Sequence, residues 1–149
     1  MFATYATNDP FNLNNTRNTR NTEQRDYNCA GYALGTFSWY CPDDEEHSPF
    51  WTLHKRTREY RASAIQKMLD EFPNLRLIKN IDECADNEYV IAFRLAKDDF
   101  HYIKRGFNKV WYHKRGGGRI ERISQDEVFD KTWCNRHKGK ITLFAMRVA

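Results

Sequence analysis

The first segment with regular apolar spacing begins at Cys29, in the stretch CAGYALGTFSWY (residues 29–40). Its apolar positions recur at intervals typical of a helix, and Asn28 is a residue type that caps helix N-termini well. The segment therefore predicts a first helix that starts at Cys29. The positions with this spacing are Ala30, Ala33, Leu34, Phe37 and Trp39.

The rest of the chain alternates between one more long helical pattern and several strand patterns. Residues 57–72 carry helical periodicity, and the Pro73-Asn74 pair is a stop signal that ends this second helix. Beyond it, short apolar or alternating runs rich in β-branched and aromatic residues predict strands. These runs are residues 75–78, 88–96, 99–105, 109–114 and 141–148.

Two of these strands flank a short turn, and a further helix follows them. Residues 106–108 separate the alternating runs 99–105 and 109–114, which predicts a β-hairpin. Ser124 with Glu127 three residues on is a capping box that opens a short helix. Helices that precede a run of strands indicate an α+β fold, with the N-terminal helices packed on an antiparallel sheet.

Composition places the chain among compact globular proteins. With 149 residues, 40% of them hydrophobic and 15% aromatic, it can form one packed domain, which we assign to residues 26–149. Residues 1–25 are rich in Asn, Thr and Arg, and are expected to form a flexible arm. No apolar run approaches the roughly 20 residues of a membrane span, and the N-terminus lacks a signal-peptide pattern. We expect a cytoplasmic protein that does not bind membranes.

The net charge and the cysteine content bear on nucleic-acid binding and on disulfide bonds. The net charge of +4 is mild, so nucleic-acid binding is the less favoured prediction, and it would use the arginines of the arm. The four cysteines, at positions 29, 41, 84 and 134, are too few and too scattered for a disulfide framework. Reduced thiols are expected.

One constellation predicts chemistry. His101 and His113 lie on the two strands of the hairpin. With the hairpin symmetric about Phe107, they would sit directly opposite each other on one face, within reach of an imidazole–imidazole hydrogen bond. A thiol at a helix start is a nucleophile once an imidazole takes its proton, and a second group must orient that imidazole. The pattern favours Cys29 as nucleophile, His101 as base and His113 as the orienting residue.

The segments NCAGYAL, DFHYIKR and VWYHKRGG resemble the corresponding motifs of the NlpC-type, papain-like cysteine peptidases and amidases. The last two also resemble an uncharacterised group of bacterial and phage proteins. The resemblance implies a papain-like core and a Cys29-His101-His113 triad that works through a covalent acyl-enzyme, without a metal or an organic cofactor. Gln24, Asn28 and Arg115 are further candidates for oxyanion or substrate binding, with Gln24 matching the glutamine that papain-like enzymes carry before the cysteine.

The expected activity is that of a thiol hydrolase or acyl transferase acting on an amide or thioester in a peptide or protein. The alternative is a non-catalytic viral or phage protein of hydrolase-like fold that docks on a host protein or on nucleic acid. A zinc site is a weaker alternative, because Cys41 with His47, and Cys134 with His137, form only loose ligand pairs. Arg115, Arg119 and Arg122 could instead bind an anion near the GGG loop.

Overall fold

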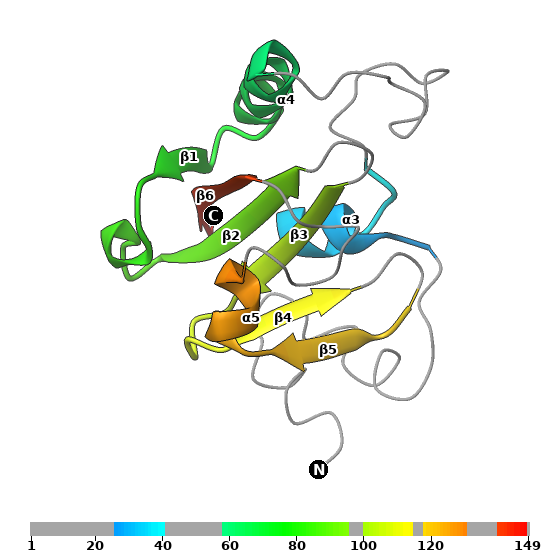
Figure 1. The fold of residues 1–149 in the computed structure, drawn as a ribbon, viewed down its shortest axis with the longest axis vertical. Helices are drawn as coiled ribbons and strands as arrows, with labels where there is room; N and C mark the ends of the chain where they lie inside the picture. The colour runs from blue at the N-terminus through cyan, green and yellow to red at the C-terminus, as the bar shows by residue number, and fades with distance from the viewer. Residues whose placement is uncertain (1–25, 41–57, 96–99, 115–117, 131–139, 149) are drawn as a thin grey trace.

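The architecture is α+β, with one antiparallel sheet of six strands and helices on its two faces (Figure 1). A computed structural model describes residues 26–40, 58–95, 100–114, 118–130 and 140–148. Within these residues the strand order is β1-β6-β2-β3-β4-β5. The prediction of an α+β chain with an antiparallel sheet is confirmed.

The described elements follow the predicted order closely. The helices are α3 (Cys29–Leu34), α4 (Arg58–Glu71), the 3₁₀ helix η3 (Ile81–Glu83) and α5 (Gln125–Phe129). The strands are β1 (Leu75–Ile78), β2 (Glu88–Leu95), β3 (Phe100–Arg105), β4 (Trp111–Lys114), β5 (Ile120–Ile123) and β6 (Lys140–Arg147).

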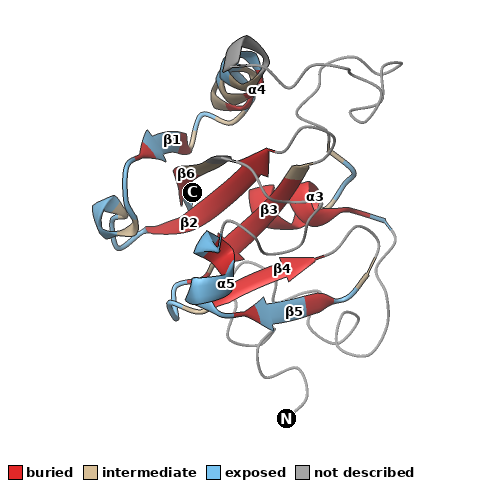
Figure 2. Ribbon diagram, viewed as in Figure 1, coloured by how far each residue is buried: buried red, intermediate tan, exposed pale blue. Residues whose placement is uncertain are grey.

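Each face of the sheet carries its own apolar cluster. The central strands β2, β3 and β4 are almost wholly buried (Figure 2). On one face, α3 and Met68 of α4 pack against Phe93 and Tyr102. On the other face, Val128 of α5 packs against Ile103 and Trp111. Because side chains alternate along a strand, β3 and β4 present different residues to the two layers.

The first helix is shorter than its apolar spacing predicts. It ends at Leu34 because Gly35 adopts a left-handed conformation (φ 77°) that caps the helix and turns the chain away. Phe37 also has a positive φ of 52°, and Trp39 is 59% exposed. The prediction that these two residues continue the helix is therefore wrong.

The turn between β3 and β4 differs from the prediction in its length. The paired residues nearest to it are Arg105 and Trp111, so the connection spans residues 106–110 and its centre is Asn108 rather than Phe107. Lys109 supplies the additional bend with a φ of 65°. Asn108 fastens the turn, because its side-chain oxygen accepts from Val110 N at 3.1 Å. The predicted register, symmetric about Phe107, is corrected by two residues.

Strand β5 was not predicted from the sequence. It pairs with β4 through Ile120 opposite Lys114 and Ile123 opposite Trp111. Only the two terminal residues of IERI are buried, so the segment lacks simple alternation.

In the part of the chain that the structure describes, no helix is long and apolar enough to cross a membrane. The predicted arm, residues 1–25, lies outside the described residues.

Candidate functional site

Cys29 is the first residue of α3, as predicted, and Asn28 forms the cap that starts this helix. The Asn28 side-chain oxygen accepts from Gly31 N at 2.9 Å and from Tyr40 N at 3.2 Å. Its amide nitrogen donates to Tyr40 O at 2.8 Å. Asn28, a candidate for oxyanion or substrate binding, thus has a structural role, because it joins the start of α3 to the segment that follows the helix.

Gly31 allows α3 to lie against its own C-terminal extension. A Cβ atom on Gly31 would stand 1.9 Å from the Ser38 carbonyl oxygen, which is inside the van der Waals limit. The Gly31 carbonyl also accepts from the backbone N–H groups of Thr36 and Phe37, both at 3.1 Å. Close backbone contact of this kind requires glycine. It fixes the direction in which the chain leaves the segment that carries Cys29.

His101 and His113 form the centre of the candidate site. His101 Nε2 lies 2.9 Å from His113 Nδ1, so one ring nitrogen donates and the other accepts. His101 is 1% exposed and His113 is 2% exposed. Their rings meet edge to face, with centroids 5.1 Å apart. The expected imidazole–imidazole hydrogen bond is confirmed.

The two histidines are diagonal neighbours rather than directly opposed residues. His113 pairs with Ile103, and His101 lies two residues before Ile103 on β3. A shift of two residues keeps both side chains on the same face of the sheet, which is why the hydrogen bond survives the corrected register. Diagonal neighbours on one face are within reach of long or aromatic side chains.

Glu121 of β5 is a further member of this site that the sequence did not reveal. It pairs directly with His113 across β4 and β5. Its Oε1 lies 3.7 Å from His113 Nε2, the ring nitrogen on the other side from His101. The order His101, His113, Glu121 therefore places a half-exposed carboxylate at the solvent end of two buried rings. Only recognition of β5 as a strand would have indicated this residue.

Helix α3 packs against β3 and β4, the two strands that carry the histidines. It contacts the face of these strands opposite the one from which the imidazoles project. Cys29 is 5% exposed and belongs to the apolar cluster that contains Tyr102. The imidazoles project from the face that carries Arg94 and Ile103. The structure thus joins the two histidines directly, and it places Cys29 within a cluster formed on the opposite face.

Tyr27 precedes the helix and is buried beside Phe37, with ring centroids 5.2 Å apart. Burial, and secondarily the negative charge of Asp26, raise the pKa of Tyr27 far above its ordinary value. Its hydroxyl has no hydrogen-bond partner among the described residues. The hydroxyl of Tyr27 therefore stays protonated at neutral pH.

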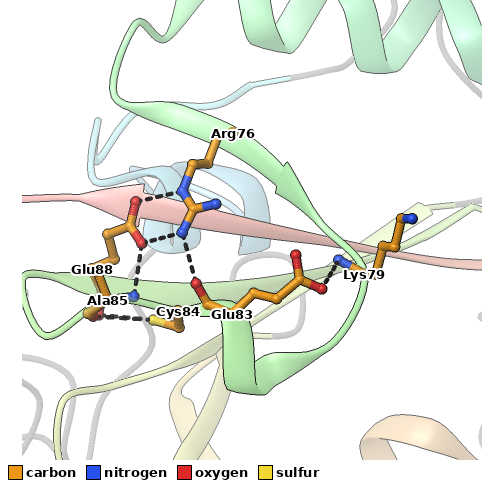
Figure 3. A network of polar contacts seen from close by, with 6 residues as sticks. All are labelled: Arg76, Lys79, Glu83, Cys84, Ala85 and Glu88. Atoms are coloured by element: carbon orange, nitrogen blue, oxygen red, sulfur yellow. Dashed lines mark hydrogen bonds and ion pairs between the residues drawn. The ribbon is translucent and has the colours of Figure 1, made fainter.

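A separate polar network closes the far end of β2 (Figure 3). Arg76 donates from Nε and Nη2 to the two carboxylate oxygens of Glu88, each at 2.8 Å, and Ala85 N donates to Glu88 at 2.9 Å. The hydrogen bonds from Arg76 lower the pKa of Glu88 to about 2. Cys84 donates its S–H to the Glu88 carbonyl oxygen at 3.2 Å, and burial raises the pKa of this thiol. The network is structural and keeps Cys84 in the thiol form.

The remaining predicted site residues lie outside the described part of the chain. Gln24 and Arg115 belong to this group, and so do the cysteines and histidines considered for zinc, at positions 41, 47, 134 and 137. Among the residues that the structure describes, no group of three or more His, Cys, Asp or Glu side chains is arranged to hold a metal ion.

Comparisons with known proteins give no further guide to this site. No family model matches the chain, and no curated protein or solved structure matches it either.

Proposed function

We propose that the protein is a thiol hydrolase or acyl transferase with a papain-like core, acting on an amide or thioester bond in a peptide or protein. The buried hydrogen bond between His101 and His113 carries the proposal. A pair of imidazoles fixed in this way is the base-and-orienter arrangement that an activated nucleophile requires. Cys29, at the start of the helix that packs on the opposite face of the same two strands, is the nucleophile, so the thiol has to meet His101 around the end of β3.

The reaction needs one proton carrier and one electron-pair donor. His101 accepts the thiol proton of Cys29, and the thiolate attacks the carbonyl carbon to form a tetrahedral adduct. The adduct collapses as the carbon–nitrogen or carbon–sulfur bond breaks, and His101 returns the proton to the leaving amine or thiol. Water or an amine then attacks the acyl-cysteine and regenerates the thiol. His113 holds the ring of His101 throughout.

The proposal requires the Cys29 sulfur to come within reach of the His101 imidazole. Because α3 packs on the face opposite the imidazoles, the Cys29 thiol has to reach His101 at the end of β3, where His101 is the second residue of the strand. Strand β4 ends one residue after His113, at Lys114.

Trapping of the acyl-enzyme tests the proposal. The protein is incubated with a small activated thioester, and the mass of each cysteine peptide is then measured. We expect a single acyl adduct on Cys29, which hydroxylamine removes. Cys29→Ala should lack it, and the matched variant Cys84→Ala should retain it. Equal acylation of all the cysteines, or none on Cys29, would contradict the proposal.

A second function is favoured by the burial of Cys29 in an apolar cluster. In that case the chain is a non-catalytic binding protein of hydrolase-like fold that docks on a host protein or on nucleic acid. It would show no acylation at Cys29, and Cys29→Ala would bind as the wild type does. A steep fall of affinity with salt concentration would identify nucleic acid as the partner.

A further inference from the structure

Two lysines in the centre of the sheet are completely buried. Lys104 of β3 and Lys114 of β4 are both 0% exposed. Lysine is among the residues least often buried in this way unless its ammonium group is paired. Both lysines project from the face that α3 covers, and the sequence shows them only as polar positions in two alternating strands.

Both ammonium groups are directed at the segment around Cys29. Lys114 Nζ donates to the Tyr27 carbonyl oxygen at 2.7 Å and lies 4.8 Å from the centroid of the Tyr27 ring. Lys104 Nζ donates to the Tyr32 carbonyl oxygen at 3.3 Å and lies 4.1 Å from the centroid of the Tyr32 ring. Carbonyl oxygens and aromatic faces carry partial negative charge, and they stabilise a buried cation.

These contacts bracket the candidate nucleophile. Tyr27 lies two residues before Cys29, and Tyr32 lies three residues after it. The ring centroid of a third aromatic residue, Tyr89 of β2, lies 5.4 Å from Lys104 Nζ. The Tyr89 hydroxyl donates to the Ala33 carbonyl oxygen at 2.8 Å. The segment that carries the thiol is therefore held to the sheet at both ends by lysines. The helix has only six residues, so its own dipole adds little to the field at Cys29.

We propose that Lys104 and Lys114 are positioning residues for Cys29. They hold the thiol segment against β3 and β4, and their positive charges favour the thiolate over the thiol. A cation near a cysteine lowers the pKa of the thiol because the thiolate is the charged form. This inference rests on the proposed function, since it assigns the charge that makes Cys29 a nucleophile at neutral pH.

Other ionisable groups also face this region, and the test has to separate their effects. Asp26 is exposed next to Tyr27, so its charge is largely screened by water. The histidine pair projects from the opposite face of the sheet, so in the proposed function His101 reaches Cys29 only around the end of β3. The ionisable side chains that share the face of α3, or belong to its segment, are Asp26, Tyr27, Tyr32, Tyr89, Tyr102, Lys104, Tyr112, Lys114 and the exposed Arg122 of β5.

The test is the pH dependence of Cys29 alkylation by iodoacetamide, followed by mass spectrometry in the full chain. Lys114→Gln keeps an N–H donor for the Tyr27 carbonyl but removes the charge, whereas Lys114→Arg keeps both. We expect the glutamine variant to shift the midpoint of the profile upwards by about one pH unit, which slows labelling at neutral pH about tenfold. The arginine variant should restore the wild-type profile.

Two comparisons make the outcome decisive. Lys104→Gln repeats the test at an independent position, in case Lys114→Gln does not fold, and Lys79→Gln removes an exposed lysine as the control. If Cys29 of the wild type reacts faster than Cys84 and neither glutamine variant shifts the profile, the lysine proposal is overturned while the hydrolase proposal stands. If Cys29 of the wild type reacts no faster than Cys84, the hydrolase proposal fails and the lysine proposal fails with it.

Discussion

His101 and His113 contact each other along a diagonal of the sheet, with Nε2 of the first 2.9 Å from Nδ1 of the second. The residue directly opposite His113 is Ile103. The five-residue turn around Asn108 sets this offset, and Lys109 adopts a left-handed conformation to close it. The hydrogen bond therefore depends on the register of the hairpin as well as on the identity of the two residues.

The backbone contact at Gly31 gives the first prediction. Gly31→Ala should destabilise the protein by roughly 2–4 kcal/mol, because the new Cβ would overlap the Ser38 carbonyl oxygen and force the backbone apart. Gly35→Ala is the matched variant, since its new Cβ would make only an ordinary contact with the Tyr89 hydroxyl, at 3.8 Å, but the residue has a φ of 77°. It should cost about 1–2 kcal/mol. Urea unfolding of both variants measures the difference, and equal losses would show that the Gly31–Ser38 contact is not rigid.

The hairpin and the first helix show which features of the fold the sequence predicts and which it does not. The alternation in DFHYIKR and KVWYHK indicates two paired strands, and the spacing of the histidines indicates a hydrogen bond between them, which the structure confirms. The register could not be derived, because nothing in the sequence marks Lys109 as a residue with positive φ. The length of α3 was overestimated, because the apolar spacing continues past the left-handed Gly35.

The polar partners in the site were harder to derive. Glu121 lies beside His113 only because IERI forms strand β5, and this segment lacks a clear alternation. Lys104 and Lys114 have the sequence pattern of polar strand positions, which usually face solvent. They are buried because α3 covers their face, and the backbone carbonyls of Tyr32 in α3 and of Tyr27 just before it accept from the two lysines. Tertiary contacts decided the environment of all three residues.

A buried tyrosine hydroxyl supplies the second prediction. Tyr27→Phe should leave the free energy of unfolding unchanged or raise it by up to about 1 kcal/mol, because the hydroxyl it removes has no partner among the described residues. Tyr89→Phe is the control, because it deletes a 2.8 Å hydrogen bond to the Ala33 carbonyl oxygen and should cost about 1 kcal/mol. Thermal unfolding of the two variants tests this. A larger loss in Tyr27→Phe than in Tyr89→Phe would contradict it.

The Arg76–Glu88 pair leads to a prediction about acid sensitivity. Arg76 lowers the pKa of Glu88 from 4.5 to about 2, so the folded state favours the carboxylate. The stability it contributes is complete above about pH 4.5 and is lost as the pH falls towards 2. Glu88→Gln should therefore lower the free energy of unfolding by roughly 1.5–3 kcal/mol at pH 7 and by much less near pH 2.

The measurement is urea unfolding of Glu88→Gln and the wild type at pH 7, 5, 3 and 2, as a series. Asp70→Asn serves as the control, because Asp70 is exposed and accepts from Gln66 on the same helix face. We expect the gap between Glu88→Gln and the wild type to shrink as the pH falls below about 4.5 and to become small near pH 2, and the gap for Asp70→Asn to stay small throughout. A gap for Glu88→Gln that does not change with pH would contradict the role of the charge.

The central claim is that the histidine pair activates the thiol at the start of α3. The most direct measurement is the rate at which a neutral haloacetamide labels Cys29 and Cys84 at pH 7, in the wild type and in His101→Ala. We predict that Cys29 is labelled at least about tenfold faster than Cys84, whose thiol is held protonated, and that His101→Ala removes most of this advantage. Slow labelling of Cys29 in the wild type, or fast labelling that survives His101→Ala, would contradict the claim.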